Sequence, residues 1–169
     1  MQYTPGKNII GKHEHMNFTS IPLTIFLTLI TMTTSAQNGL ITIESQHSVN
    51  KTADRFEKAI NDKGLKFFMR IDHTQNAKNA DLTLRPTQVI LFGNPVAGTA
   101  LMKCGQSVAI DLPQKALFWE DEAGKSWISF NDPKYLKKRH DLNDCDPVLE
   151  KVSGLLSTLA NAAAVKNVD

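Results

Sequence analysis

The hydrophobic pattern of the chain has two periods, and they divide it into predicted strands and predicted helices. Apolar and polar residues alternate, with the two-residue period of a strand, in segments 39–45, 65–73, 115–121 and 125–130. Acidic residues and Gly124 separate the last two of these segments, which is typical of a hairpin with a short loop.

The first helix is predicted directly after the first strand. Ser48 can accept a hydrogen bond from an early backbone N–H, and apolar residues between Val49 and Ile60 recur at helical spacing. Gly64 then supplies a residue that readily adopts the left-handed conformation at the end of a helix.

Further helices are predicted at four places. The polar segment 73–82 has room for one or two turns, and segment 96–104 follows a turn at Gly93-Asn94-Pro95. Prolines at the first helical position open helices after Asp132 and Asp146. The last helix has an apolar stripe of Val148, Val152, Leu155, Leu159 and Ala163.

Two strands carry more specific expectations. In segment 65–73, strict alternation puts Phe67, Met69, Ile71 and His73 on one face, which we expect to point toward the helices. The continuous apolar run 89–92 predicts a central strand that is covered on both faces.

The order of these elements is β-α-β(4)-α, and it predicts an α+β fold. Hairpin-like strands in succession, with helices at both ends, favour a two-layer sandwich with a mostly antiparallel sheet and helices packed on one face. No repeat or linker divides residues 37–169, so we expect them to form a single domain.

Residues 1–36 have the pattern of a signal peptide and an upstream segment. Ile21–Met32 is an apolar run of 12 residues, shorter than the roughly 20 that span a bilayer, and small residues follow it. We expect cleavage near Ala36–Gln37, no stable membrane span afterwards, and export to the periplasm or the extracellular space. A membrane anchor and a cytosolic core strand are the alternatives, and translation can start at Met1 or Met16.

The charge balance argues against a nucleic acid as partner. The chain has 19 basic and 17 acidic side chains, of which only Lys7, Lys12 and Glu14 precede the expected cleavage point. A nearly neutral chain lacks the clustered positive charge that binds a phosphate backbone.

Two cysteines, Cys104 and Cys145, follow the expected cleavage point. In an exported protein they can form one disulfide. The alternative is that each is a separate small hydrophobic residue.

Two candidate sites come from motifs. Gly93 and Gly98-Thr99 resemble the spacing of a phosphate loop, but the lysine of that motif is missing, so a strand-to-helix turn is favoured. His73, His140 and Cys104 could bind a metal or haem, because imidazole and thiolate suit transition metals. The alternative is a hydrogen-bonded histidine at the edge of the core and a solvated histidine at a helix end.

The motifs "RIDH", "LRPTQVILFGNPVAGTALM", "AIDLP", "LFWEDEAGKSWISFNDPKYL" and "RH" together resemble a family known as domain of unknown function 302. The positions that match its recurrent motifs are Asp72, His73, Arg85, Pro86, Thr87, Phe92, Gly93, Asn94, Pro95, Gly98, Thr99, Asp111, Leu112, Pro113, Glu120, Asp121 and His140. The resemblance implies a compact α+β domain that is often exported and forms dimers. It implies no established reaction, and Ala100 and Cys104-Gly105 depart from the family pattern.

The leading hypothesis for function is a homodimeric module that binds a small molecule, a metal or haem, with the cofactor unknown. Its expected ligand-binding residues are His73, Arg85, Asn94, Thr99 and His140. One alternative is a structural or protein-interaction module. Another is a small enzyme that uses His73 as a general acid or base near Asp72 or Asp111.

Overall fold

The computed structural model describes residues 1–2, 34–35 and 39–165. The run Ile21–Met32 and the expected cleavage point Ala36–Gln37 lie outside the described residues. The described elements, in chain order, are β1 (Thr34–Ser35), β2 (Leu40–Ser45), α1 (Val49–Asp62), β3 (Lys66–Asp72), α2 (His73–Asn79), β4 (Thr87–Gly93), α3 (Pro95–Cys104), the 3₁₀ helix η1 (Gln106–Asp111), β5 (Gln114–Glu120), β6 (Ser126–Asn131), α4 (Pro133–Arg139) and α5 (Asp146–Ala164).

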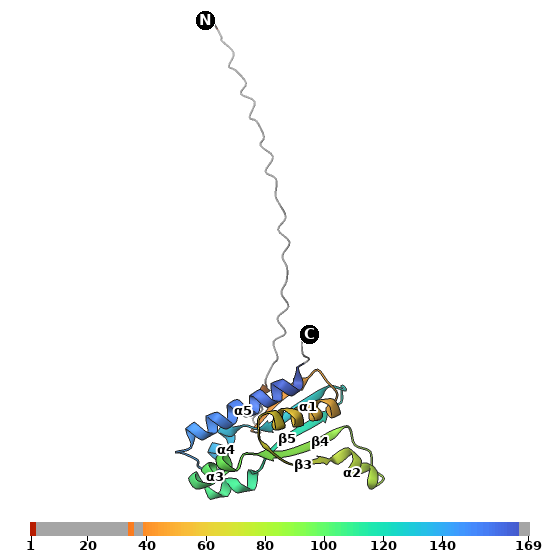
Figure 1. Cartoon of the computed structure of the whole chain (residues 1–169). Coiled ribbons are helices and arrows are strands. Elements are labelled where there is room, and N and C mark those ends of the chain that lie inside the picture. The colour runs from red at the N-terminus through yellow and green to blue at the C-terminus, as the bar shows by residue number, and fades with distance from the viewer. Residues whose placement is uncertain (3–33, 36–38, 166–169) are drawn as a thin grey trace.

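The strands form one sheet in the order β1-β2-β6-β5-β4-β3, and every neighbouring pair is antiparallel. Helices α1 and α5 lie side by side over one face of this sheet, while α3 lies at one end and α2 at the other (Figure 1). The predicted α+β class and its helix-covered antiparallel sheet are confirmed.

The core lies between the sheet and the two long helices. Phe56 of α1 makes edge-to-face contacts with Phe92 of β4 and Phe118 of β5, each with ring centroids 5.2 Å apart. From α5, the buried residues are Leu149, Val152, Leu156, Leu159, Ala160, Ala163 and Ala164. The predicted stripe on this helix is therefore right in part, because Val148 and Leu155 lie half-buried at its margin.

The predicted helix ends are confirmed at several positions. The Ser48 side chain accepts a hydrogen bond from the backbone N–H of Lys51, and Gly64 adopts a left-handed φ of 63° directly after α1. Asn94 and Asp132 cap α3 and α4, each followed by a proline in the first turn.

The expectation that the 89–92 strand is covered on both faces is wrong. In β4, Gln88, Ile90 and Phe92 are buried beneath the helices, whereas Val89 and Leu91 face the other side and remain half-buried. Apolar residues follow one another here because the second face also has apolar cross-strand neighbours. Val89, for example, lies between Ile71 and Leu117.

The predicted alternation in the 65–73 strand is also wrong. The register of β3 shifts between Phe67 and Met69, so Phe68 is an extra residue and the alternation reverses after it. Arg70 therefore points toward α1, where its guanidinium donates to Asp54 at 2.6 Å. Met69 and Ile71 lie on the opposite face.

A buried polar network joins β3, β4 and α1. The Gln88 side chain is 4% exposed; its oxygen accepts from Arg70 and its nitrogen donates to Asn50 and to Asp72. Every polar group of this buried amide therefore has a partner, as stability requires.

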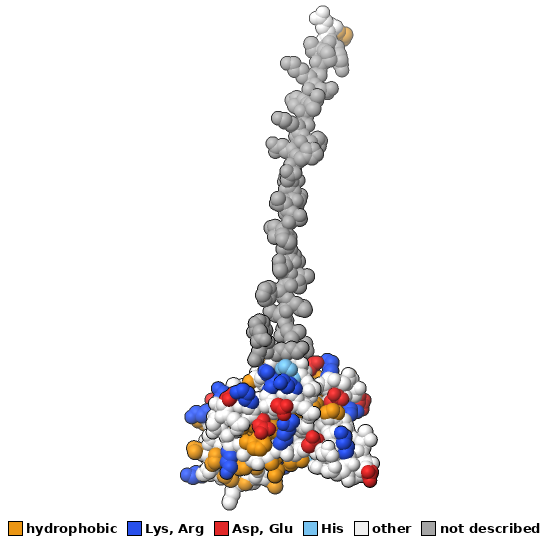
Figure 2. All heavy atoms as spheres, turned by 45° about the vertical axis from the view of Figure 1, so that its right-hand side comes forward, with side chains coloured by type: hydrophobic (Ala, Val, Ile, Leu, Met, Phe, Trp, Pro, Cys, Tyr) orange, Lys and Arg blue, Asp and Glu red, His pale blue; other side chains and the backbone are white. Residues whose placement is uncertain are grey.

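One face of the molecule carries basic and acidic side chains that are interspersed, with apolar side chains along its lower edge (Figure 2). In the described part of the chain, no helix is long and apolar enough to cross a membrane.

Candidate functional site

An apolar pocket of about 370 Å³ lies at one end of the helix layer. It is formed where β4 ends, between α3, η1, the start of β5 and the middle of α5. Leu101, Met102, Val152 and Leu156 make up much of its wall. Its volume falls in the usual range for small-molecule sites, roughly 300–1,000 Å³.

The motif at the end of β4 builds one side of the pocket. The Asn94 side-chain oxygen accepts from the backbone N–H groups of Val96 at 2.9 Å and Ala97 at 3.3 Å, which starts α3 directly after the strand. Gly98 of α3 faces the Leu112 side chain, which directly follows η1. This local geometry turns the chain around the pocket.

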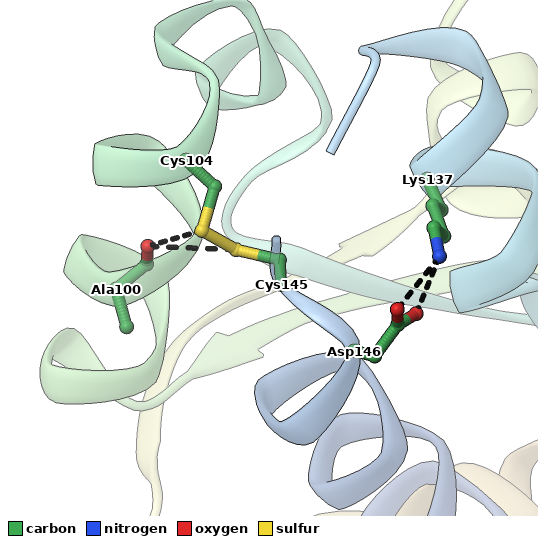
Figure 3. The surroundings of a disulfide bond; sticks show 5 residues. All are labelled: Ala100, Cys104, Lys137, Cys145 and Asp146. Carbon is green, nitrogen blue, oxygen red and sulfur yellow. Dashed lines mark hydrogen bonds and ion pairs between the residues drawn. A yellow bond between two sulfur atoms is a disulfide. The ribbon is translucent and has the colours of Figure 1, made fainter. Parts of the chain in front are cut away.

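A disulfide between Cys104 and Cys145 joins the end of α3 to the start of α5, with the two Cα atoms 6.2 Å apart (Figure 3). Both sulfur atoms lie near the carbonyl oxygen of Ala100, at 3.5 and 3.9 Å; a disulfide has no hydrogen to donate, so these are contacts only. Lys137 of α4 also pairs with Asp146 at 2.6 Å. The two helices that face each other across the pocket are thus covalently connected.

His140 forms a second polar cluster beside η1. Its Nε2 lies 2.6 Å from Asp111 Oδ2, and its Nδ1 lies 3.0 Å from the Ser107 hydroxyl. The carboxylate of Asp111 also lies 3.6 Å from Arg139. The imidazole side chain is only 5% exposed, and Asp111 only 13%, whereas Ser107 is exposed.

The carboxylate determines which histidine nitrogen accepts a hydrogen bond. The Asp111 carboxylate accepts a hydrogen bond from Nε2–H, so in the neutral imidazole Nδ1 is left as an acceptor for the Ser107 hydroxyl. Gly105 permits this approach, because a Cβ there would lie 2.7 Å from Leu142 and 3.0 Å from the His140 carbonyl oxygen. The cluster therefore has a carboxylate, a base and a hydroxyl in series.

Comparison with known proteins gives the family. Residues 41–159 match the family described as "Domain of unknown function DUF302". The chain belongs to the DUF302 family.

The crystal structure of an uncharacterised conserved DUF302 protein from Bacillus stearothermophilus is similar to this chain, with a TM-score of 0.67 at 16% identity. The match covers 74% of this chain and 98% of that one, and it confirms the DUF302 fold.

Curated relatives are similar over 111 residues at 45% identity. They are "Fluoride-specific ion channel FluC 1" of Brucella suis and of Brucella abortus, and "Fluoride-specific ion channel FluC 2" of Brucella melitensis. The match covers 66% of this chain and only 41–44% of theirs, so it spans less than half the length of these relatives.

Within this DUF302 chain, the structure separates the five residues predicted to bind a ligand. Asn94 and Thr99 line the pocket, and His140 lies in the Asp111–Ser107 cluster. His73 begins α2, and the Arg85 carbonyl oxygen accepts from the Thr74 hydroxyl of the same helix. Helix α2 lies at the opposite end of the sheet from α3 (Figure 1).

His73 does not occupy the strand end that its sequence pattern indicated. The Asp72 carboxylate accepts from the backbone N–H of Gln75 and thereby caps α2, so His73 is the first helical residue and is exposed. Arg85 donates from Nε to the carbonyl oxygen of Glu120 at 3.1 Å and lies 3.8 Å from Glu122. These contacts link Arg85 to the end of β5 and to the turn between β5 and β6.

The structure also separates the residues proposed to bind a metal. Cys104 is in the disulfide and has no thiolate to offer, and His73 and His140 lie on different elements. Among the described residues, no three histidine, cysteine or carboxylate side chains come together in a group that could hold a metal ion.

Asp121 is the carboxylate whose environment clearly changes its acidity. A hydrogen bond from the Trp127 indole at 2.8 Å, followed by backbone N–H groups of Lys125 and Ala123, lowers the pKa of Asp121 below its usual 3.8. These bonds shape the β5–β6 turn. Asp121 is therefore a structural residue of the hairpin rather than a merely solvated one.

Sequence reasoning missed two residues, Gln114 and Ser107. Gln114 is buried in the pocket wall, and its parity with Ala116 and Phe118 in the fifth strand could have indicated the helix-facing side. For Ser107 no comparable signal exists, because its contact with His140 spans 33 residues.

Removal of the disulfide is expected to destabilise the protein. For a sequence separation of 41 residues, the Cys104→Ser/Cys145→Ser variant should lose about 4 kcal/mol of unfolding free energy, since the open chain gains conformational entropy. Urea denaturation of the variant and of the wild type, without reductant, measures this difference. Wild type with reductant should behave like the variant; equal stability in all three samples contradicts the prediction.

Proposed function

We propose that this DUF302 chain is a binding module for a small, largely apolar molecule held in the pocket between α3, η1 and α5. The observation that carries the proposal is the pocket itself, whose volume and apolar wall are those of a ligand site. Two of the five residues expected to bind a ligand, Asn94 and Thr99, line it.

The proposal narrows the original hypothesis of a small-molecule, metal or haem ligand. The described lining of the pocket contains no histidine, cysteine or carboxylate. Those side chains are the usual ligands of transition metals and of haem iron. An organic molecule therefore suits this wall better than a metal centre.

We also propose that the chain is exported and acts as a homodimer. The apolar run Ile21–Met32 supports export, and so does the Cys104–Cys145 disulfide, because disulfides persist mainly in oxidising compartments. The proposal of a dimer comes from the family resemblance. A molar mass in solution of twice that of one chain would support it.

The names of the Brucella relatives suggest the interaction-module alternative rather than a fluoride site in this pocket. Those proteins are named fluoride-specific ion channels, and the part similar to this chain is less than half of each. The described pocket lining has no cationic side chain to pair with an anion. As one part of a longer protein, a domain of this kind would serve as a protein-interaction module.

Blocking the pocket tests the binding function. Ala97 lines the pocket, whereas its neighbour Val96 on α3 is 80% exposed and does not. The neutral fluorophore N-phenyl-1-naphthylamine should bind wild type saturably, and Ala97→Phe should weaken that binding at least about tenfold by filling the space. Val96→Phe, the matched control, should bind as wild type does.

Fluorescence titration measures both variants, and thermal unfolding verifies that each is folded. The proposal fails if wild type shows no saturable binding, or if folded Ala97→Phe binds the fluorophore as tightly as wild type does.

The Ser107–His140–Asp111 cluster favours a second candidate function, a small hydrolase. The general base in this hypothesis is His140, which is hydrogen-bonded to the Ser107 hydroxyl. It replaces His73, which is exposed at the start of α2. The Ser107 oxygen would attack an ester carbonyl while its proton passes to His140 Nδ1. The ester C–O bond then breaks, the leaving alcohol takes that proton, and water later hydrolyses the acyl-serine.

Labelling with p-nitrophenyl acetate tests this second function. Peptide mass spectrometry should find one acetyl group on Ser107 in wild type, and much less in Asp111→Asn, in which the histidine is no longer oriented. Ser107→Ala should remove the label. Acetylation scattered over lysines, or equal in wild type and Asp111→Asn, would exclude an activated serine.

A further inference from the structure

Gln114 is the buried polar residue of the pocket. It is the first residue of β5, where it pairs with Phe92 of β4 and faces the helix layer. Its exposed fraction is 9%, and it belongs to the pocket wall. The amide is thus held away from bulk water, at the edge of the hollow.

Among the described residues, no hydrogen bond of the Gln114 amide is found, and its atoms are not fully buried. Gln88, a buried glutamine on the same face of the sheet, uses both its oxygen and its nitrogen in hydrogen bonds. The Gln114 amide instead keeps some solvent access at the pocket, where a ligand group can pair with it.

The other polar side chains of the wall differ from Gln114. Asn94 and Thr99 are exposed to solvent, and the Asn94 oxygen already accepts two backbone hydrogen bonds. Water can satisfy what remains of them. Of the polar residues in the described lining, Gln114 is the largely buried one, and its amide can both donate to and accept from a ligand.

The described lining contains no charged side chain. An ion in this pocket would lose its hydration without gaining a counter-charge, which is far more costly than burying a neutral group. We infer that the pocket takes an uncharged molecule with an apolar body and a hydrogen-bonding group, and that the Gln114 amide binds this group. This inference rests on the proposed binding function and names its ligand class.

A matched series of eight- and nine-carbon compounds tests the ligand class. Octanamide, octanoate and nonane share an apolar chain and differ at one end, which is an amide, an anion at neutral pH or a methyl group. Each is titrated against bound N-phenyl-1-naphthylamine. Octanamide should displace the fluorophore at a concentration at least about tenfold lower than octanoate does.

The variant Gln114→Met tests the role of the amide, because methionine has a similar size and no hydrogen-bonding group of comparable strength. Octanamide should bind about five- to tenfold more weakly to this variant, while nonane binds as before or better. Gln106→Met is the matched control: Gln106 is exposed on η1 and is not part of the pocket wall, so this change should leave both affinities unchanged.

The outcomes separate the inference from the function on which it rests. If the fluorophore binds but octanoate displaces it as well as octanamide does, or Gln114→Met leaves octanamide binding unchanged, the ligand class is wrong and the binding function stands. If no compound and no fluorophore binds folded wild type, the binding function itself falls.

Discussion

The Phe56 ring joins the helix layer to the sheet, with its edge against Phe92 and Phe118 on two neighbouring strands. Together with the buried apolar residues of α5, this contact covers the middle of one face of the sheet. At the end of β4, beside Phe92, α3 and η1 extend this cover. The pocket lies where these two coverings meet, so its position follows from the packing of the core.

The pocket wall comes from distant parts of the chain, and a covalent bond holds two of them together. Cys104 ends α3 and Cys145 precedes α5, so the disulfide limits how far the two helices can separate. Gly105 allows one further close approach, because a Cβ there would lie 2.7 Å from the Leu142 side chain. An apolar hollow with one largely buried amide suits a neutral ligand.

Much of the fold was predictable because its signals are local. The Ser48 and Asn94 caps, the prolines at helix starts and the hairpin at Gly124 each act over a few residues. Predictions failed where one residue changed the outcome for its neighbours. The extra residue Phe68 reversed the alternation of β3, and the Asp72 cap moved His73 from a strand into a helix.

The candidate site was less predictable, because it depends on contacts between distant segments. Asn94 and Thr99 were identified through their motif, but no spacing indicates that η1 and α5 meet them, or that Ser107 meets His140.

Methyl-carbon NMR during titration with 1-octanol tests whether a neutral ligand binds in the pocket between α3, η1 and α5. If it does, the methyl signals of Leu101, Val152 and Leu156 should shift and saturate. The signals of Val89 and Leu117, on the opposite face of the sheet, should not shift. Shifts at Val89 and Leu117, or none that saturate in the pocket, would contradict it.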